Sequence, residues 1–160
     1  MSALSKNESM IEIRTADPAL PDALALLSAG HAAMCSLFPE KRNMKFSVDA
    51  LLYDHVTLVL AYHNDVPVGC CAVSIQTDYS ELKRLFVTPE ARRLGLAMLL
   101  IEHVEGFACA QRSKKVMLES GVSLSAAHKL YLRAGYIQCK AFGSHEDLPK
   151  SLFFEKALAN

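Results

Sequence analysis

The chain has 160 residues, of which 51% are apolar, and its 17 basic and 17 acidic side chains cancel to a formal net charge of zero. This length favours a single domain, residues 1–160, with enough apolar surface to form a core. The balanced charge gives no global field that would attract nucleic acid or an acidic membrane, so we expect neither as a partner.

The cysteines and histidines form no recognisable disulfide or metal pattern. The five cysteines include no C-x-x-C spacing, and the adjacent Cys70 and Cys71 should point to opposite faces of a strand. The six histidines show no H-x-x-x-H or H-E-x-x-H spacing. We therefore expect free thiols and no bound metal. Residues 1–10 are polar and are expected to form a flexible tail, and no apolar run is long enough to span a bilayer, which favours a cytoplasmic protein.

The N-terminal third is predicted to form a strand and two helices. Apolar and polar residues alternate over residues 11–14, which indicates a short strand. Asp17 and Pro18 supply a cap and a first helical residue for a helix that continues to about Leu37, and Ser47 should cap a short second helix through Leu52. Helical spacing predicts that the buried face of the long helix comprises Leu20, Leu24, Leu27, His31 and Met34, with His31 as a packed or hydrogen-bonded residue.

The remaining elements complete a mixed α/β sheet. Three strands joined by short turns should form an antiparallel meander at residues 56–62, 66–75 and 81–87. A helix follows from Leu96 to about Arg112. The last predicted elements are a strand at 115–119, a helix capped by Ser123 or Ser125 and ended by Gly135, and strands at 136–139 and 151–156. The total is about seven strands and four helices.

The loop that joins strand 81–87 to the next helix has the character of an anion site. It comprises Arg92, Arg93, Leu94, Gly95, Leu96 and Ala97. Free backbone N–H groups and the positive dipole end at a helix N-terminus favour a phosphate, and small residues let a ligand approach the backbone. Tight packing of the turn beside a solvated arginine pair is the alternative explanation of the same residues.

A second motif lies in the helix that precedes Gly135. It contains Ala127, Leu130 and Tyr131 on one face and is followed by Gly135 and Tyr136. Taken alone, Tyr131 would be an ordinary core residue.

Together the two motifs resemble those of the GCN5-related N-acetyltransferases, the GNAT family. Arg92-x-x-Gly95-x-Ala97 looks like the pyrophosphate-binding signature of that family. The second motif, from Ala127 to Tyr136, looks like its recurrent Ala-x-x-Leu-Tyr-x-x-x-Gly-Phe/Tyr element. The resemblance covers nearly the whole chain from Ile11 onward. One departure is that family members often carry an Asn near the start of this helix that touches the cofactor, where this chain has Leu124, Ser125 and Ala126.

The resemblance implies a GNAT-like acyl-CoA N-acyltransferase fold. Its fourth and fifth strands would be parallel and splay apart, leaving a cleft for coenzyme A. Acetyl-CoA would place its pyrophosphate on the N–H groups from Arg93 to Ala97, beside Arg92. Its pantetheine arm would pair, like an extra strand, with the backbone of Leu85, Phe86 and Val87. The implied activity is direct transfer of an acetyl group to an amine acceptor, by a monomer or a homodimer.

Two residues are candidates for the chemistry. Tyr131 is the candidate proton donor to the departing thiolate, because a phenol, with an ordinary pKa of about 10, stays protonated at neutral pH. Glu81 is the candidate base, because it lies 11 positions before Arg92, where the histone acetyltransferase branch of the family carries its glutamate base. On a regular strand Glu81 would share a face with Lys83 and Leu85. A surface ion pair of Glu81 with Lys83 or another basic side chain is the alternative.

The nature of the acceptor stays open at this point. The loops at 38–46 and 140–150 are expected to border it, and they carry side chains of both signs. Glu40, Glu146 and Asp147 would suit a cationic amine, while Lys41, Arg42, Lys45 and Lys150 would suit a carboxylate. A small amine, an amino acid and a protein amine are all compatible. The alternatives to an enzyme are a non-catalytic acyl-CoA-binding sensor or interaction module with the same fold and an unrelated nucleotide-binding protein, although the chain contains no P-loop.

Overall fold

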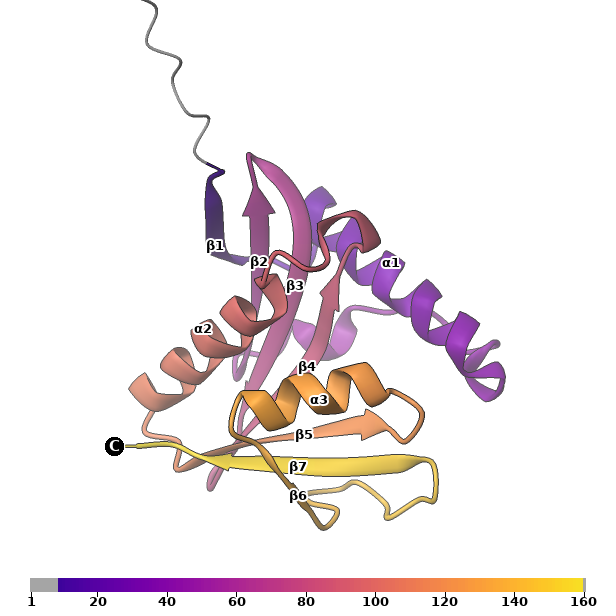
Figure 1. Ribbon diagram of the computed structural model, residues 1–160, viewed down its shortest axis with the longest axis vertical. Coiled ribbons are helices and arrows are strands. Elements are labelled where there is room, and N and C mark those ends of the chain that lie inside the picture. The colour runs from indigo at the N-terminus through magenta and orange to yellow at the C-terminus, as the bar shows by residue number, and fades with distance from the viewer. Residues whose placement is uncertain (1–8, 160) are drawn as a thin grey trace, which may run out of the picture.

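The computed structural model describes residues 9–159, which form a mixed sheet with helices on both faces (Figure 1). The expected tail at residues 1–10 therefore lies almost wholly outside the described residues. The seven strands are arranged in the order β1-β2-β3-β4-β5-β7-β6. Their bounds are β1 Ile11–Ala16, β2 Val56–His63, β3 Val66–Ile75, β4 Ser80–Val87, β5 Lys115–Gly121, β6 Ile137–Cys139 and β7 Ser151–Ala157.

The predicted meander is confirmed, since β2, β3 and β4 pair antiparallel in sequence order. Strands β2 and β3 are buried on both faces, as their near-continuous apolar sequences indicate. Cys70 packs with the core on one face of the sheet and Cys71 with the core on the other. The prediction that these neighbouring thiols point in opposite directions is therefore correct, and both are free cysteines.

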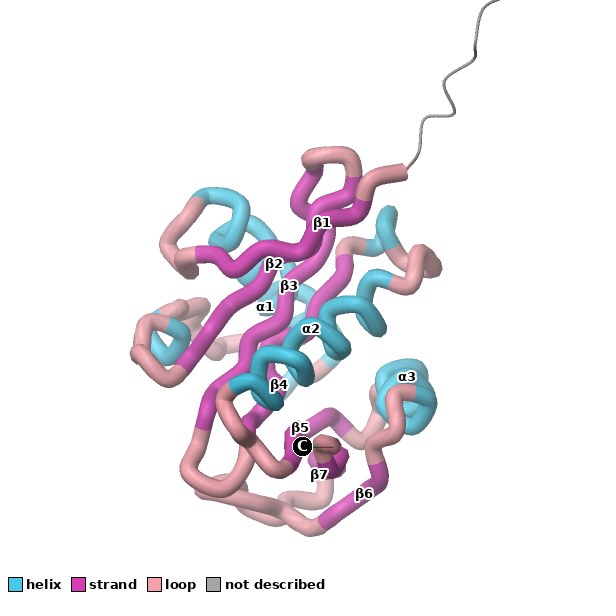
Figure 2. Tube along the Cα trace, turned by 90° about the vertical axis from the view of Figure 1, so that its left-hand side faces the viewer, coloured by secondary structure: helices cyan, strands magenta, loops and turns pink. Residues whose placement is uncertain are grey.

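Three α-helices cover the sheet. Helix α1 (Pro21–Leu37) lies against one face, where its Ala23, Leu26 and Leu27 pack on β2 and β3. Helices α2 (Leu96–Ala110) and α3 (Ser125–Arg133) pack into the core of the other face. Figure 2 shows α1 and α2 on opposite sides of the strands. Short 3-10 turns at Pro39–Lys41, Asp49–Leu51 and Pro89–Ala91 complete the connections.

Several local predictions for the helices are wrong. Helix α1 begins at Pro21 rather than Pro18, because Asp17 instead closes a turn by accepting a hydrogen bond from the Ala19 N–H. The expected second helix is only the 3-10 turn Asp49–Leu51, too short a segment to sustain a helix without a packed face. Neither serine caps α3, whose N-cap is Leu124.

The buried face of α1 is also turned relative to the prediction. Leu27 is buried as expected, but Leu20, Leu24 and Met34 are exposed, and Ala23 and Leu26 take their place. The small residue Gly30 explains this rotation, since a Cβ there would lie only 3.3 Å from the Phe86 side chain of β4. The helix turns its small side chains toward the sheet and thereby approaches it closely. His31 Nε2 donates a hydrogen bond to the Met44 carbonyl oxygen in the following loop, at 2.8 Å, which confirms its hydrogen-bonded role.

The sheet splays between its fourth and fifth strands. Strands β4 and β5 are parallel, as expected, but pair only at Ser80 with Val116 and Glu81 with Met117. Beyond this point they diverge, with β4 running toward the N-terminus of α2 and β5 running beneath α3 (Figure 1). The molecule thus has two halves, β1–β4 with α1 and α2, and β5–β7 with α3, joined where β4 and β5 begin.

Candidate active site

The loop before α2 presents free backbone donors. Arg93 and Gly95 adopt positive φ angles of 70° and 75°, which turn the chain sharply into the helix. In the described part of the chain, no group accepts a hydrogen bond from the backbone N–H of Arg93, Leu94 or Gly95, and the first turn of any helix adds further unpaired N–H groups. A Cβ built on Gly95 meets nothing within 4 Å. The loop therefore has donors and open space for an anion.

Strand β4 contains a bulge that the sequence analysis did not predict. Cys70 pairs with Phe86 and Ala72 pairs with Lys83, so β4 holds one extra residue opposite Cys71. Arg84 lies at this bulge with a φ of 57°. The extra residue shifts the alternation of the strand, so that Leu85 packs with the α2 core while Glu81 and Lys83 line a pocket on the α1 side. The expectation that Glu81 shares a face with Leu85 is wrong for this reason.

Glu81 lies at the start of β4 and is largely buried, with 8% of its surface exposed. It lines a pocket of about 420 Å³, called here the Glu81 pocket. Side chains that line this pocket include Tyr53, His55, Tyr79, Lys83 and His145. Burial, followed by the nearby charge of Glu81, raises the pKa of Tyr79, so its phenol stays neutral at physiological pH.

Glu81 is paired with a histidine rather than with Lys83. His145 Nε2 lies 2.7 Å from Glu81 Oε1, and His145 Nδ1 lies 2.7 Å from Glu119 Oε2 on β5. The partner of Glu81 is thus a basic side chain other than Lys83, and the pair is largely buried rather than on the surface. His145 was not among the sequence candidates, and its only sequence signal is its place in the long 140–150 connection.

Tyr131 lies on the buried face of α3, as its spacing predicted. Its ring packs against those of Tyr136 and Phe154, with centroids 6.1 and 5.8 Å away. Burial raises the pKa of Tyr131 well above its usual range, and the neighbouring Cys71 thiol adds to the shift. Cys71 lies opposite the bulge of β4, so Tyr131 lies beside the distorted part of that strand.

The two loops expected at the acceptor side lie next to each other but contribute unequally. Gly143, Ser144 and His145 of the 140–150 loop line the Glu81 pocket. The 38–46 loop does not appear among its lining residues, and Glu40 instead pairs with Lys150 at 3.5 Å. These two charges, proposed above for opposite kinds of acceptor, therefore neutralise each other.

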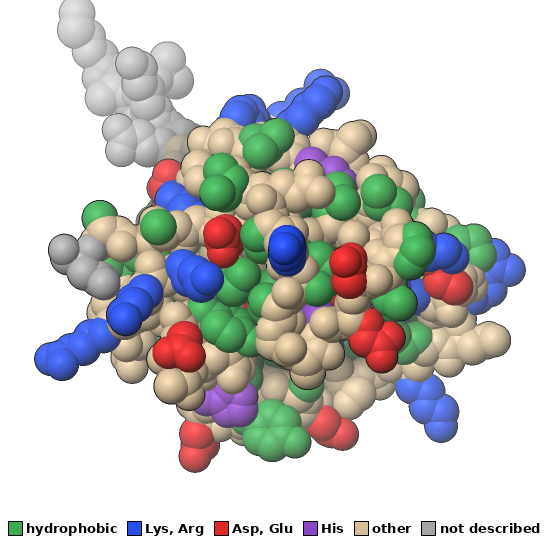
Figure 3. All heavy atoms as spheres, turned by 90° about the horizontal axis from the view of Figure 1, so that it is seen from below, with side chains coloured by type: hydrophobic (Ala, Val, Ile, Leu, Met, Phe, Trp, Pro, Cys, Tyr) green, Lys and Arg blue, Asp and Glu red, His purple; other side chains and the backbone are tan. Residues whose placement is uncertain are grey.

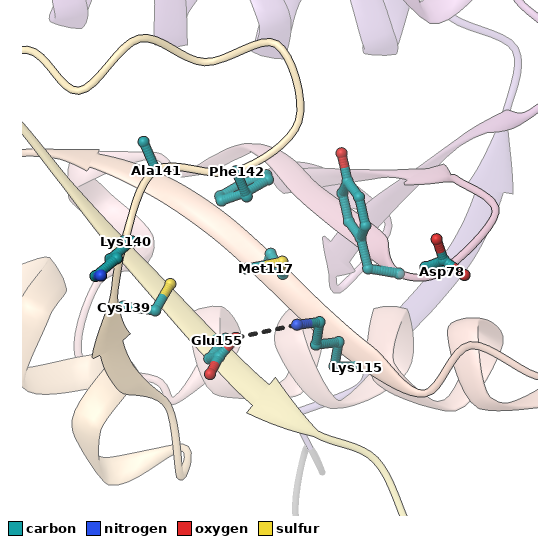
Figure 4. A pocket seen from close by; sticks show the side chains of 9 residues that line it. Asp78, Lys115, Met117, Cys139, Lys140, Ala141, Phe142 and Glu155 are labelled. Carbon is teal, nitrogen blue, oxygen red and sulfur yellow. Dashed lines mark hydrogen bonds and ion pairs between the residues drawn. The ribbon is translucent and has the colours of Figure 1, made fainter.

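A second hollow, of about 450 Å³, lies on the other side of Tyr79. Figure 4 shows Met117 at its floor and the ion pair between Lys115 of β5 and Glu155 of β7 across it. Basic and acidic side chains are interspersed on the face seen in Figure 3, with no field of a single sign. Within residues 9–159, no cluster of His, Cys, Asp or Glu is arranged to hold a metal ion, and no helix is long and apolar enough to cross a membrane.

The sequence model of the acetyltransferase (GNAT) family matches residues 27–136, which include both motifs and the splayed strands. The chain belongs to the GNAT family. It is 33% identical to a protein named IAA acetyltransferase from Azospirillum brasilense, over 76% of this chain and 81% of that relative. It is 27% identical to the N-acetyltransferase YedL of Escherichia coli, over 93% of this chain and 96% of YedL.

Solved structures agree with this family assignment. A protein from Klebsiella pneumoniae described as an acyl-CoA N-acyltransferase superposes with a TM-score of 0.79 at 26% identity, covering 94% of this chain and 99% of that one. A GNAT family acetyltransferase from Elizabethkingia anophelis, solved with acetyl-CoA bound, has the same fold at 18% identity, with a TM-score of 0.70 and coverage of 92% and 98%. The chain is thus an acetyltransferase of the GNAT type, and its splayed mixed sheet is the GNAT fold.

Proposed function

We propose that this GNAT protein transfers the acetyl group of acetyl-CoA directly to an amine held in the Glu81 pocket. The observation that carries the proposal is the position of three features along β4. The pocket with Glu81 lies where the strand begins, the bulge at Arg84 lies midway, and the loop with free N–H groups follows its end. From Glu81 to Val87 a strand covers about 20 Å, a distance that an extended cosubstrate can bridge.

Acetyl-CoA would be held by the backbone of this region. The N–H groups from Arg93 to Ala97 would bind its pyrophosphate, with Arg92 and Arg93 adding positive charge. Leu85, Phe86 and Val87 lie where β4 has no pairing with β5, so an extended arm could pair with their backbone there, in place of the long 3.4 Å hydrogen bond that Arg92 Nε donates to the Val87 carbonyl. The Asn that other family members use at the start of α3 is replaced in this chain by Leu124, Ser125 and Ala126, so the β4 and α2 contacts carry more of the binding.

The chain's own residues account for the proton movements of acetyl transfer. Acetyl-CoA supplies a thioester, whose carbonyl carbon is attacked by the amine nitrogen. A new C–N bond forms and the C–S bond breaks. Glu81 would take the proton that the amine nitrogen loses, and Tyr131 would give a proton to the departing thiolate. Backbone N–H groups near the Arg84 bulge would stabilise the negative charge that develops on the carbonyl oxygen.

The acceptor is proposed to be an amine that approaches from the α1 side of the sheet, where the Glu81 pocket opens. Glu81 and Lys83 both line this pocket, so it offers one carboxylate and one ammonium group. Cys35, Cys70, Cys71 and Cys139 are free thiols, which suits a reducing compartment such as the cytoplasm. We place the enzyme there, as a monomer or a homodimer.

The test is calorimetric titration of the protein with acetyl-CoA, CoA, NAD and ATP. We expect acetyl-CoA to bind, and the Gly95→Glu variant to lose on the order of 100-fold in affinity because it puts a negative charge at the pyrophosphate. Gly106→Glu is the matched control, since Gly106 lies on the same helix with nothing within 4 Å of its Cβ position. It should bind like the intact protein.

Amines would then be screened for release of free CoA thiol. Thiol release confirms transfer, whereas acetyl-CoA binding without turnover on any amine would favour the non-catalytic sensor. Equal affinity in the Gly95→Glu variant and the intact protein, both folded by circular dichroism, would show that the loop does not hold the pyrophosphate.

A further inference from the structure

His145 lies between two carboxylates that come from different halves of the molecule. Its Nε2 is 2.7 Å from Glu81 Oε1 on β4, and its Nδ1 is 2.7 Å from Glu119 Oε2 on β5. The side chains of His145, Glu81 and Glu119 are 26%, 10% and 33% exposed. The imidazole thus connects Glu81, the carboxylate that lines the pocket, to Glu119, which is open to water.

The imidazole is fixed in this orientation by its surroundings. The rings of Phe142 and Phe153 pack against it, with centroids at 4.9 and 5.8 Å. The backbone N–H of His145 donates to the Phe142 carbonyl at 3.0 Å. Ring packing and two hydrogen bonds leave the side chain little freedom, so the geometry at Glu81 is set by the 140–150 loop.

The two contacts are short enough to be hydrogen bonds, and a ring nitrogen that carries a proton donates to the carboxylate oxygen that faces it. The ring is therefore held from two sides, by one carboxylate from each half of the molecule. The other titratable groups at the pocket are Lys83, His55, Tyr53 and Tyr79.

We propose that His145 is a positioning residue for acetyl transfer, held by Glu119 and acting through Glu81. This rests on the proposed role of Glu81 as the base. By bonding to Oε1, His145 leaves Glu81 Oε2 to accept the proton of the amine.

A purely structural role for His145 predicts a different kinetic result from a positioning role. If His145 only fastened the 140–150 loop, its loss would weaken acceptor binding and raise KM without changing kcat or its dependence on pH. A positioning role predicts that kcat falls while the KM of the acceptor stays the same.

The experiment compares four variants with the intact protein. His145→Gln keeps a hydrogen-bond donor but cannot carry charge or bridge both glutamates, and Glu119→Gln removes the charge behind the ring. Glu81→Gln is the reference for complete loss of the base. Glu102→Gln is the matched control, since Glu102 lies on α2, is exposed and forms no ion pair in the described structure. For each, kcat and KM are measured against pH, and acetyl-CoA affinity by calorimetry.

We expect kcat to fall roughly 10- to 100-fold in His145→Gln, with unchanged acetyl-CoA affinity, and further in Glu81→Gln. Glu102→Gln should keep both the kcat and the KM of the intact protein. A change confined to the KM of the acceptor would overturn the proposal.

A second readout does not depend on turnover. Nitrogen-15 NMR of the imidazole should show a hydrogen bond at each ring nitrogen of His145, and Glu119→Gln should lose the one at Nδ1. An imidazole without a hydrogen bond at Nε2 in the intact protein would refute the positioning role, while failure of every amine to release thiol would instead count against acetyl transfer itself.

Discussion

Tyr131 is deeply buried, and as the proposed proton donor its hydroxyl must give up a proton during the reaction. Burial raises the pKa of its phenol, so the hydroxyl stays protonated throughout the pH range in which the enzyme works. For a proton donor this is the required form. It also means that ionisation of Tyr131 cannot limit the rate on the alkaline side until well above the ordinary pKa of a tyrosine.

We expect Tyr131→Phe to lower kcat by about 100-fold, since it removes the donor and leaves the ring. The contacts with Tyr136 and Phe154 involve the ring alone, so the melting temperature should change little. The alkaline side of the pH profile should keep its shape up to about pH 10. Stopped-flow measurement of thiol release checks this, and an unchanged kcat in a folded variant would remove Tyr131 from the mechanism.

At the residue level, local sequence patterns predicted where candidates lie but not what they touch. Helical spacing placed Tyr131 on a buried face, and the distance from Arg92 placed Glu81 at the start of β4. His145 was missed because its partners, Glu81 and Glu119, are 64 and 26 positions away in the sequence. The Arg84 bulge was missed because arginine is not a residue that signals positive φ. Both depend on tertiary contacts.

Close contacts between elements join the two halves of the molecule. Gly121 ends β5, and a Cβ there would lie 2.5 Å from the ring of Phe38, just after α1. Gly121→Ala should therefore displace Phe38 and cost about 1–3 kcal/mol of unfolding free energy. Gly106→Ala, in the exposed middle of α2 with open space around it, should instead stabilise by about 0.5–1 kcal/mol.

Urea denaturation of both variants measures these opposite signs. Two substitutions of the same kind are compared, so intrinsic differences between Gly and Ala are controlled. Equal stability of Gly121→Ala and the intact protein would mean that Phe38 moves aside without cost and that this contact does not hold the halves together.

At the element level, the order and type of the strands followed from their sequences, but helix details did not. Apolar alternation and β-branched runs are properties of each strand alone, and they predicted all seven strands. The buried face of α1 depends instead on how closely Gly30 approaches Phe86 of β4. Helical spacing alone cannot distinguish a face built on Leu24 from one built on Ala23 and Leu26.

The whole molecule buries several weak acids in neutral form. Burial raises the pKa of Cys70 from 9.0 to about 12 and that of Cys71 well above 9.0. Burial likewise raises the pKa values of Tyr131 and Tyr136 above their usual 10.0. The unfolded chain releases these protons from about pH 9 upward, whereas the folded chain keeps them. Stability is therefore complete below pH 9 and lost progressively above it.

Thermal melts between pH 7 and 11 should show this loss, with up to about 1.4 kcal/mol per pH unit for each such group. Cys70→Ala should flatten the decline between pH 9 and 11, because it removes one of the groups. A melting temperature that is constant to pH 11 would contradict the buried, neutral state of these thiols and phenols.

Strand β4 turns away from β5 after only two paired residues, so the second half of its backbone has no neighbouring strand on that side within the described chain. Bare strand edges are templates for aggregation, because any extended segment, including one from another copy, can hydrogen-bond to them. The bulge at Arg84, with its positive φ, interrupts this edge, and bulges of this kind make a poor match for a straight foreign strand. The Arg84 bulge beside the proposed cosubstrate site therefore also protects the open edge of β4 against pairing with strands from other copies of the protein.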